Sequence, residues 1–221
     1  QKVGEYALTK AENWTHTFTG LLKTDGDGNP YVYTVTEAQV SGFALRLTEP
    51  DANAGDDFDY TLHNKAYEGQ FSKRDIDGNE LPGASMQILD GAGNLIASWT
   101  STDQPYVLRG KLNPNTDYVL KEIAAPNGYL VTTQIPFHMD GDMHATVGTI
   151  TYGGVDANNI VYMKDAATTV TFSKKIAGGG RELAGATLIL TDTTPYSGQP
   201  ADQITRTWVS DGTDQTLTAE L

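Results

Sequence analysis

FSKRDIDGNELPGA, residues 71–84, decides how this 221-residue chain is organised. The stretch returns as FSKKIAGGGRELAGA at residues 172–186, with one residue inserted. In both copies an apolar strand pattern ends in lysine and runs into a turn rich in glycine and polar residues. A repeat of this kind indicates tandem copies of one structural unit, each opened by the same strand.

The pattern along the rest of the chain is typical of short β-strands. Stretches that alternate with a period of two are separated by clusters of Gly, Asp, Asn and Pro. No stretch of a dozen residues shows helical periodicity. The fold class predicted from this spacing is all-β, built from tandem antiparallel β-sandwiches. The main strand candidates are NWTHTF, YVYTVTE, SMQILD, YVLKEI, VTFSKK and ATLILTD.

A second repeated pair sets the domain boundaries. YTVTEAQVSGF, from Tyr33, matches YVLKEIAAPNGY, from Tyr118, as Tyr-x-x-x-Glu followed by glycine and an aromatic residue. Only the middle unit contains both the Tyr-x-x-x-Glu motif and the opening strand that begins with Phe-Ser-Lys. We therefore expect the C-terminal part of one domain at 1–66, a complete domain at 67–167 and the N-terminal part of a further domain at 168–221, so that the first and last are incomplete.

Composition excludes several classes of partner. The net charge of −13 disfavours nucleic acid and anionic membrane surfaces, because both would repel the chain. There is no apolar run near the ~20 residues that a membrane span needs, so we expect no membrane insertion in this segment. Cysteine is absent, which rules out disulfides and thiolate metal sites. No cofactor is predicted.

Three strands of the middle unit each place one ionisable side chain on an otherwise apolar face, because alternate residues of a strand share a face. The three polar groups are a lysine in the opening strand, a glutamate in the Tyr-x-x-x-Glu strand and an aspartate in the closing strand. The predicted faces are Phe71 with Lys73, Tyr118 and Leu120 with Glu122, and Val161 and Met163 with Asp165. Equivalent inward groups in the outer units are Glu37, Asn64 and Lys174.

Burying these three charges costs several kcal/mol per ion. Desolvation lowers the pKa of a lysine and raises that of a glutamate, so proton transfer would leave a neutral amine, which is a nucleophile. Lys73 could then attack the Asp165 carboxyl carbon while protonated Glu122 polarises its oxygen, and loss of water would leave an amide. A non-bonded salt bridge, or side chains solvated at the strand ends, are the alternatives.

The same motifs carry a resemblance to a known family. FSKRDIDGNELPGA, YVLKEIAAPNGY and IVYMKDA, in that order, resemble the lysine strand, the E-box and the closing strand of Cna-B-type (SpaA-like) domains, the inverse-immunoglobulin sandwiches of Gram-positive pilins and adhesins. The resemblance implies a self-formed isopeptide bond between Lys73 and Asp165, with Glu122 as proton shuttle. Glu37 would be the equivalent shuttle in the first domain.

The outer units depart from that family pattern. Asn64 matches an acceptor in the first unit, but Lys2 and Lys10 stand too close to NWTHTF to serve as its opening lysine. Lys174 matches the nucleophile of the third unit, whose shuttle and acceptor are missing. We therefore expect one complete bond and treat Asn64 and Lys174 as unpaired isopeptide candidates. Whether another chain completes the first domain stays open.

Metal binding is a weaker hypothesis. In HMDGDMH, a hairpin about Gly141 would set His138 opposite His144, a weak candidate site for zinc or copper. The alternative is an exposed turn, which we favour. DGDGN at residues 25–29 is similar to a calcium loop, but Pro30 stands where an EF-hand requires glycine and Thr36 where it requires glutamate, so a turn is expected there too.

The sequence predicts a structural protein rather than an enzyme, because the histidines show no nucleophile-plus-base arrangement. The favoured function is a stalk or pilus-shaft segment, extracellular and attached to the cell wall or a pilus by resemblance, whose partners are neighbouring domains or subunits. One alternative is an adhesin that binds a host matrix protein or glycan through loops such as TDTTPYSGQPADQ, from Thr191. Another is an accessory module of a secreted enzyme.

Overall fold

The computed structural model describes residues 2–50, 60–132, 134–191 and 205–218. Contacts divide the chain into two units, residues 1–38 with 45–63 and residues 39–44 with 64–221, which we describe separately. Among the described residues the regular elements are strands β1 to β15 and one 3-10 turn, η1 (Lys10–Glu12). This confirms the all-β fold class.

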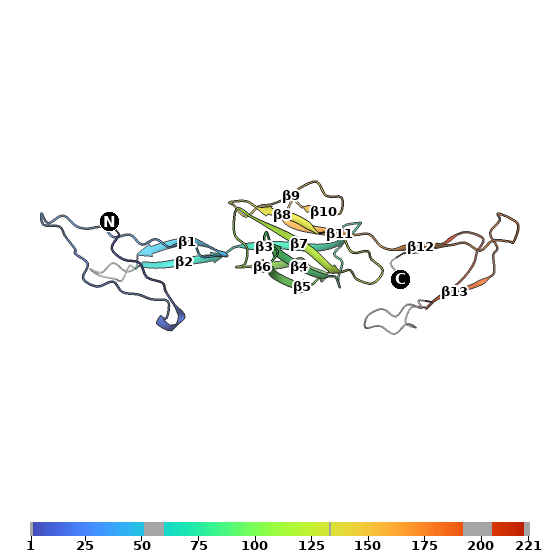
Figure 1. The fold of residues 1–221 in the computed structure, drawn as a ribbon, viewed down its shortest axis with the longest axis horizontal. Helices are drawn as coiled ribbons and strands as arrows, with labels where there is room; N and C mark the ends of the chain where they lie inside the picture. The colour runs from blue at the N-terminus through green and yellow to red at the C-terminus, as the bar shows by residue number, and fades with distance from the viewer. Residues whose placement is uncertain (1, 51–59, 133, 192–204, 219–221) are drawn as a thin grey trace. The chain divides into compact units, whose positions relative to one another are not determined.

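Two facing sheets form the body between residues 67 and 167 (Figure 1). One sheet has the order β10-β11-β3-β6, and the other has the order β5-β4-β7-β8-β9. The first contains β3 (Glu68–Asp75), β6 (Tyr106–Arg109), β10 (Gly153–Val155) and β11 (Ile160–Asp165). The second contains β4 (Ser85–Asp90), β5 (Leu95–Thr100), β7 (Thr116–Ala124), β8 (Ile135–Met139) and β9 (Ala145–Val147).

One ladder departs from the antiparallel pattern. β3 and β11 pair in parallel, with Phe71 opposite Val161 and Lys73 opposite Met163. Parallel neighbours need a long crossover connection, and here almost the whole domain lies between the two strands. The opening and closing strands of the domain are therefore hydrogen-bonded neighbours.

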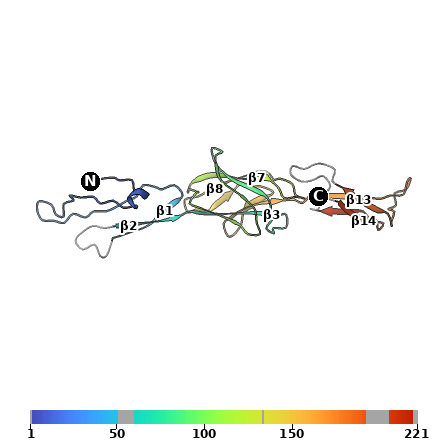
Figure 2. The same ribbon diagram turned by 90° about the horizontal axis from the view of Figure 1, so that it is seen from below.

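The core lies between the two sheets and explains the alternation seen in the sequence. The Phe71 ring of the first sheet packs 5.5 Å from the Phe137 ring of the second, and the two layers face each other in Figure 2 as well. The buried core residues are Phe71, Ala84, Met86, Ile88, Leu108, Leu112, Tyr118, Leu120, Ile135, Phe137, Met139, Ala145, Val161 and Met163.

A five-residue turn closed by aspartate recurs through the chain. In each copy the aspartate Oδ1 accepts the N–H of the fourth residue after it at 2.8–3.1 Å, and the residue before that donor is left-handed, with φ between 61° and 98°. Glycine suits that position, which explains the Asp-Gly-Asn clusters. The copies span residues 25–29, 75–79, 90–94, 140–144 and 156–160.

A buried serine repeats as well, which sequence analysis missed. Ser101 Oγ accepts the Ala84 N–H at 2.8 Å and donates to the Leu81 carbonyl at 2.6 Å. Ser210 Oγ makes the same two bonds with Ala186 and Leu183, at 2.9 and 2.7 Å. The signal was present as Trp-x-Ser at 99–101 and 208–210.

Replacing Ser101 with alanine should lower the free energy of unfolding by about 1–3 kcal/mol, because the Ala84 N–H and the Leu81 carbonyl lose a buried partner. Urea denaturation measures this. Ser98→Ala is the control, since Ser98 is exposed on β5, the strand that ends just before Ser101. Equal effects of the two variants would contradict a structural role for the repeated serine.

The C-terminal segment repeats the pairing of the first four strands of the middle body. β12 (Thr169–Phe172) pairs with β15 (Gln215–Thr218), as β3 does with β6. β13 (Thr187–Thr191) pairs with β14 (Thr205–Val209), as β4 does with β5. The sequence repeat therefore extends to strand pairing.

The N-terminal part differs from the sequence prediction. Its strands are β1 (Phe43–Pro50) and β2 (Tyr60–Ala66), which pair with each other. NWTHTF and YVYTVTE were predicted as strands and are not, so those two predictions were wrong. A strand persists only where a neighbour satisfies its backbone N–H and C=O groups. The described residues give residues 31–37 no such ladder, and bonds such as Tyr60 Oη to the Tyr33 carbonyl, at 2.8 Å, hold the segment instead.

Candidate functional site

Three ionisable side chains that are far apart in sequence meet between the two sheets. Lys73 comes from β3, Asp165 from the end of β11 and Glu122 from the facing strand β7. Lys73 Nζ donates to Asp165 Oδ1 and lies 3.1 Å from Glu122 Oε1. All three side chains have 0% exposure. We call these residues the triad.

Strand register explains how the lysine reaches the aspartate. Lys73 lies opposite Met163 in the parallel ladder, so Asp165 is two positions farther along the same face of β11. The long lysine side chain spans this offset. From the other sheet, Glu122 follows Tyr118 and Leu120 on the inward face of β7, and these three residues are at most 4% exposed. The structure thus brings together the three inward groups named from sequence.

Burial shapes the electrostatics of the triad. Desolvation raises the pKa of Glu122 above its ordinary value, and the nearby Asp165 charge adds to this effect. A hydrogen bond from the Thr132 N–H and the Lys73 charge oppose it only in part. Glu122 therefore keeps its proton to higher pH than an exposed glutamate.

The triad is incompletely hydrogen-bonded. Among the described residues, Glu122 Oε1 and Asp165 Oδ2 have no hydrogen-bond partner, although Glu122 Oε1 lies at ion-pair distance from Lys73 Nζ. Buried charges whose lone pairs are unsatisfied are costly. An amine, a carboxyl carbon and an acid held together without water can lower this cost by condensing to a neutral amide.

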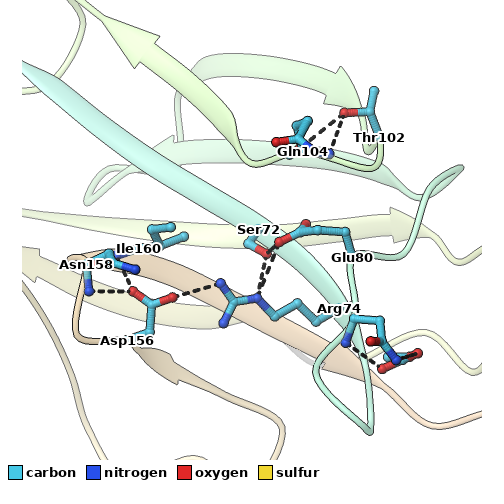
Figure 3. A network of polar contacts seen from close by, with 10 residues as sticks. Ser72, Arg74, Glu80, Thr102, Gln104, Asp156, Asn158 and Ile160 are labelled. Atoms are coloured by element: carbon cyan, nitrogen blue, oxygen red, sulfur yellow. Dashed lines mark hydrogen bonds and ion pairs between the residues drawn. The ribbon is translucent and has the colours of Figure 1, made fainter.

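A second polar network lies on the opposite face of β3, as Figure 3 shows. Arg74 donates from Nη2 to Asp156 Oδ2 at 2.8 Å and from Nε to Ser72 Oγ at 2.8 Å, and Ser72 Oγ donates to Glu80 Oε1 at 2.5 Å. Although burial opposes it, the Arg74 hydrogen bond helps to lower the pKa of Asp156. Sequence analysis missed this network, which ties β3 to the turn before β11.

The same outer-face contacts occur beside the second lysine of the repeat. Ser173 Oγ donates to Glu182 Oε1 at 2.8 Å, and Lys175 Nζ lies 3.5 Å from that oxygen. In the first copy, Lys73 faces the core while its neighbours Ser72 and Arg74 lie on the outer face of β3. Lys73 belongs to the triad, and Ser72 and Arg74 anchor β3 from outside.

The outer-unit candidates are placed differently from their expected positions. Glu37 is half-buried, whereas Asn64 on β2 and Lys174 after β12 are exposed. The expectation that Asn64 and Lys174 point inward was wrong for the described structure. A lysine becomes buried where two sheets close over it, and the described strands around Lys174 form only two-stranded ladders.

The histidine hairpin has another register than expected. His138 lies opposite Thr146, because the aspartate turn from Asp140 to His144 closes first and the ladder begins at Met139 and Ala145. His138 Nδ1 instead lies 2.7 Å from Asp117 Oδ1, and His144 Nδ1 lies 3.6 Å from Asp140 Oδ2. Within the described ranges, no group of three His, Asp or Glu side chains could hold a metal ion.

Two further observations bear on the sequence predictions. Of the helices in the part of the chain that the structure describes, none has the length and apolar character needed to cross a membrane. The loop TDTTPYSGQPADQ, named as the candidate adhesive loop, lies outside the described residues except for Thr191.

Two protein families match parts of the chain. Residues 68–152 match the SpaA family, described as a prealbumin-like fold domain. Residues 1–65 match the Cna_B family, described as the Cna protein B-type domain. No curated protein matches the chain.

Solved structures similar to this chain include three pilus proteins. The pilus adhesin SpaC from Lactobacillus rhamnosus GG is 17% identical, with a TM-score of 0.43 over 95% of this chain and 29% of its own. The shaft pilin SpaA from the same organism is 17% identical, with a TM-score of 0.37 over 65% and 54% of the two chains. BcpA, the major pilin subunit of Bacillus cereus, is 14% identical, with a TM-score of 0.32 over 48% and 30%. This chain thus spans less than a third of the length of SpaC.

Proposed function

We propose that this chain, parts of which match the Cna protein B-type and SpaA prealbumin-like domain families, is a stalk or pilus-shaft segment of a Gram-positive cell-surface protein. In this proposal an isopeptide bond between Lys73 and Asp165 locks the middle domain. The observation that carries the proposal is the buried triad, in which an amine touches a carboxyl beside a carboxylic acid of raised pKa.

The proposed reaction condenses two side chains of the protein itself. Glu122 accepts a proton from the Lys73 ammonium, and the neutral Nζ attacks Cγ of Asp165. Glu122 returns that proton to the departing Asp165 oxygen, the nitrogen passes its second surplus proton through Glu122 to the same oxygen, and the C–O bond breaks to release water. One ammonium and one carboxylate become one amide and one water, so charge and atoms balance. Because Lys73 and Asp165 are consumed, the reaction occurs once per molecule and is not enzymatic turnover.

The position of the bond suits a load-bearing protein. It joins strands β3 and β11, which open and close the domain, across 92 positions of sequence. A pull on the two ends of the domain would pass through the covalent bridge, so the chain between Lys73 and Asp165 could not be extended. Without cysteine, the chain has no disulfide to serve this purpose.

The proposed location and partners are supported by the matched families rather than by the triad. We place the chain outside the cell, with neighbouring domains or subunits of the same surface protein or pilus as its partners. The acidic net charge of −13 is compatible with a solvated extracellular segment.

The direct test is the mass of the denatured protein together with its proteolytic peptides. We expect a mass lower than the sequence mass by one water, and a branched peptide that joins the fragments containing Lys73 and Asp165. The branched peptide is essential because Gln1 can cyclise and lose ammonia. An unmodified mass with two separate peptides would mean that the triad is only an ion pair.

A further inference from the structure

A short segment after the glutamate strand pairs with the residues that directly follow the strand ending in Asp165. Gly128 O accepts the Thr168 N–H at 2.8 Å, Tyr129 bridges Ala167, and Leu130 N donates to Ala166 O at 3.2 Å. We call residues 128–132 the strap. Its middle side chains, Leu130 and Val131, are more than half exposed.

Thr132, the last residue of the strap, contacts both sides of the triad. Its N–H donates to Glu122 Oε2 at 2.8 Å, and its hydroxyl donates to the Lys164 carbonyl at 2.7 Å. Lys164 immediately precedes Asp165. One half-buried residue therefore connects the shuttle carboxyl on one sheet to the backbone of the acceptor strand on the other.

The Thr132 N–H also determines which carboxyl oxygen of Glu122 is left for chemistry. Because Oε2 accepts this hydrogen bond, Oε1 is the oxygen that lies 3.1 Å from Lys73 Nζ. A carboxyl that could rotate would present either oxygen, at varied distances from the amine. Rates of reactions between held groups are sensitive to displacements of about 1 Å.

We propose that Thr132 is a positioning residue for isopeptide formation: its hydroxyl ties the strap to β11, and its N–H thereby holds the Glu122 carboxyl against Lys73 and Asp165. This inference rests on the proposed function. Thr132 does not exchange protons with the reacting atoms, and its effect is on the distance and orientation of Glu122.

The test compares rates of bond formation. Each variant is synthesised in a cell-free system and quenched in acidic denaturant at set times, and the linked fraction is measured as loss of one water. Thr132→Val keeps the β-branched shape and the backbone N–H but removes the hydroxyl, and we expect roughly tenfold slower linking. Thr132→Ser retains the hydroxyl and should restore a rate close to that of the unsubstituted chain.

Thr116→Val is the matched control. The Thr116 hydroxyl also donates to a carbonyl, that of Pro114 at 3.0 Å, but it lies at the start of β7, away from Glu122. Its linking rate should be unchanged. The two valine variants are also compared in a Lys73→Met background, where no bond can form, so that any difference in folding stability is measured separately.

The outcomes separate the inference from the function on which it rests. If the unsubstituted chain links and Thr132→Val links as fast as Thr116→Val, the positioning role is wrong and the proposed function stands. The positioning role is also wrong if Thr132→Ser is as slow as Thr132→Val, because the hydroxyl then does not matter. If the unsubstituted chain never loses water, both proposals fall.

Discussion

Glu122→Gln is expected to leave Lys73 and Asp165 unlinked and to lower the thermal midpoint of the middle domain by roughly 16 to 40 °C. A cross-link across 92 positions stabilises the folded state by roughly 4–5 kcal/mol on the chain-entropy model. Each kcal/mol shifts the midpoint of a domain of this size by about 4–8 °C. Glutamine can still accept the Thr132 N–H but cannot carry the proton between the amine and the carboxyl.

Calorimetry and intact mass on the same samples measure this effect. The neutral substitution leaves the Lys73 and Asp165 charges paired, so the loss of stability reports on the missing bond rather than on an unpaired charge. Glu68→Gln is the control, because Glu68 lies on β3 with a partly exposed ion pair to Arg109 at 2.9 Å. A Glu122→Gln protein that still loses one water would remove Glu122 from the mechanism.

Lys73→Met should produce a domain whose stability falls as pH rises, the reverse of ordinary acid denaturation. Methionine fills similar space but leaves Glu122 and Asp165 buried without a cation. Burial raises the pKa of Glu122, the Asp165 charge raises it further, and removal of Lys73 takes away a charge that lowered it.

The sign follows from proton binding. A carboxyl with a raised pKa in the folded state holds its proton when the unfolded chain has released it. The contribution of this carboxyl to the free energy of unfolding is complete at pH values below about 4.3, its pKa in the unfolded chain. The contribution is lost as the pH rises through the higher pKa of the folded state. In that window the free energy of unfolding should fall by about 1.4 kcal/mol per pH unit for each such proton.

Urea denaturation at a series of pH values measures the slope. In the linked protein the Asp165 carboxyl has become an amide, so the free energy of unfolding should depend less on pH. Lys111→Met is the control, because Lys111 is exposed and a similar apolar side chain replaces it. A flat or rising profile for Lys73→Met would show that water reaches the two carboxyls and that the site is not dry.

Sequence patterns predicted the centre of the site because strand alternation is a local property. Once β3, β7 and β11 are recognised as strands, the two-residue period places Lys73, Glu122 and Asp165 on apolar faces. The internal repeat added the domain boundaries, and the family resemblance supported the bond and the shuttle role that the buried charges had already suggested.

The groups that support the triad could not be found in this way. The Arg74 contact with Asp156 spans 82 positions, and the Thr132 contact with Lys164 spans 32. Both depend on which loop passes beside which strand. Ser101 is an intermediate case, because its Trp-x-Ser context repeats, although only the structure reveals its partners, Ala84 and Leu81.

The wrong predictions have the same origin. Residues 31–37 have the alternation of a strand but no ladder among the described residues, and Asn64 and Lys174 are exposed where no facing sheet covers them. By itself, then, the sequence determined the all-β class, the repeat and the face on which each polar group of the middle unit stands, because these depend on neighbours along the chain. Only the tertiary structure decided which of those faces are buried and which groups meet, because burial requires a second sheet.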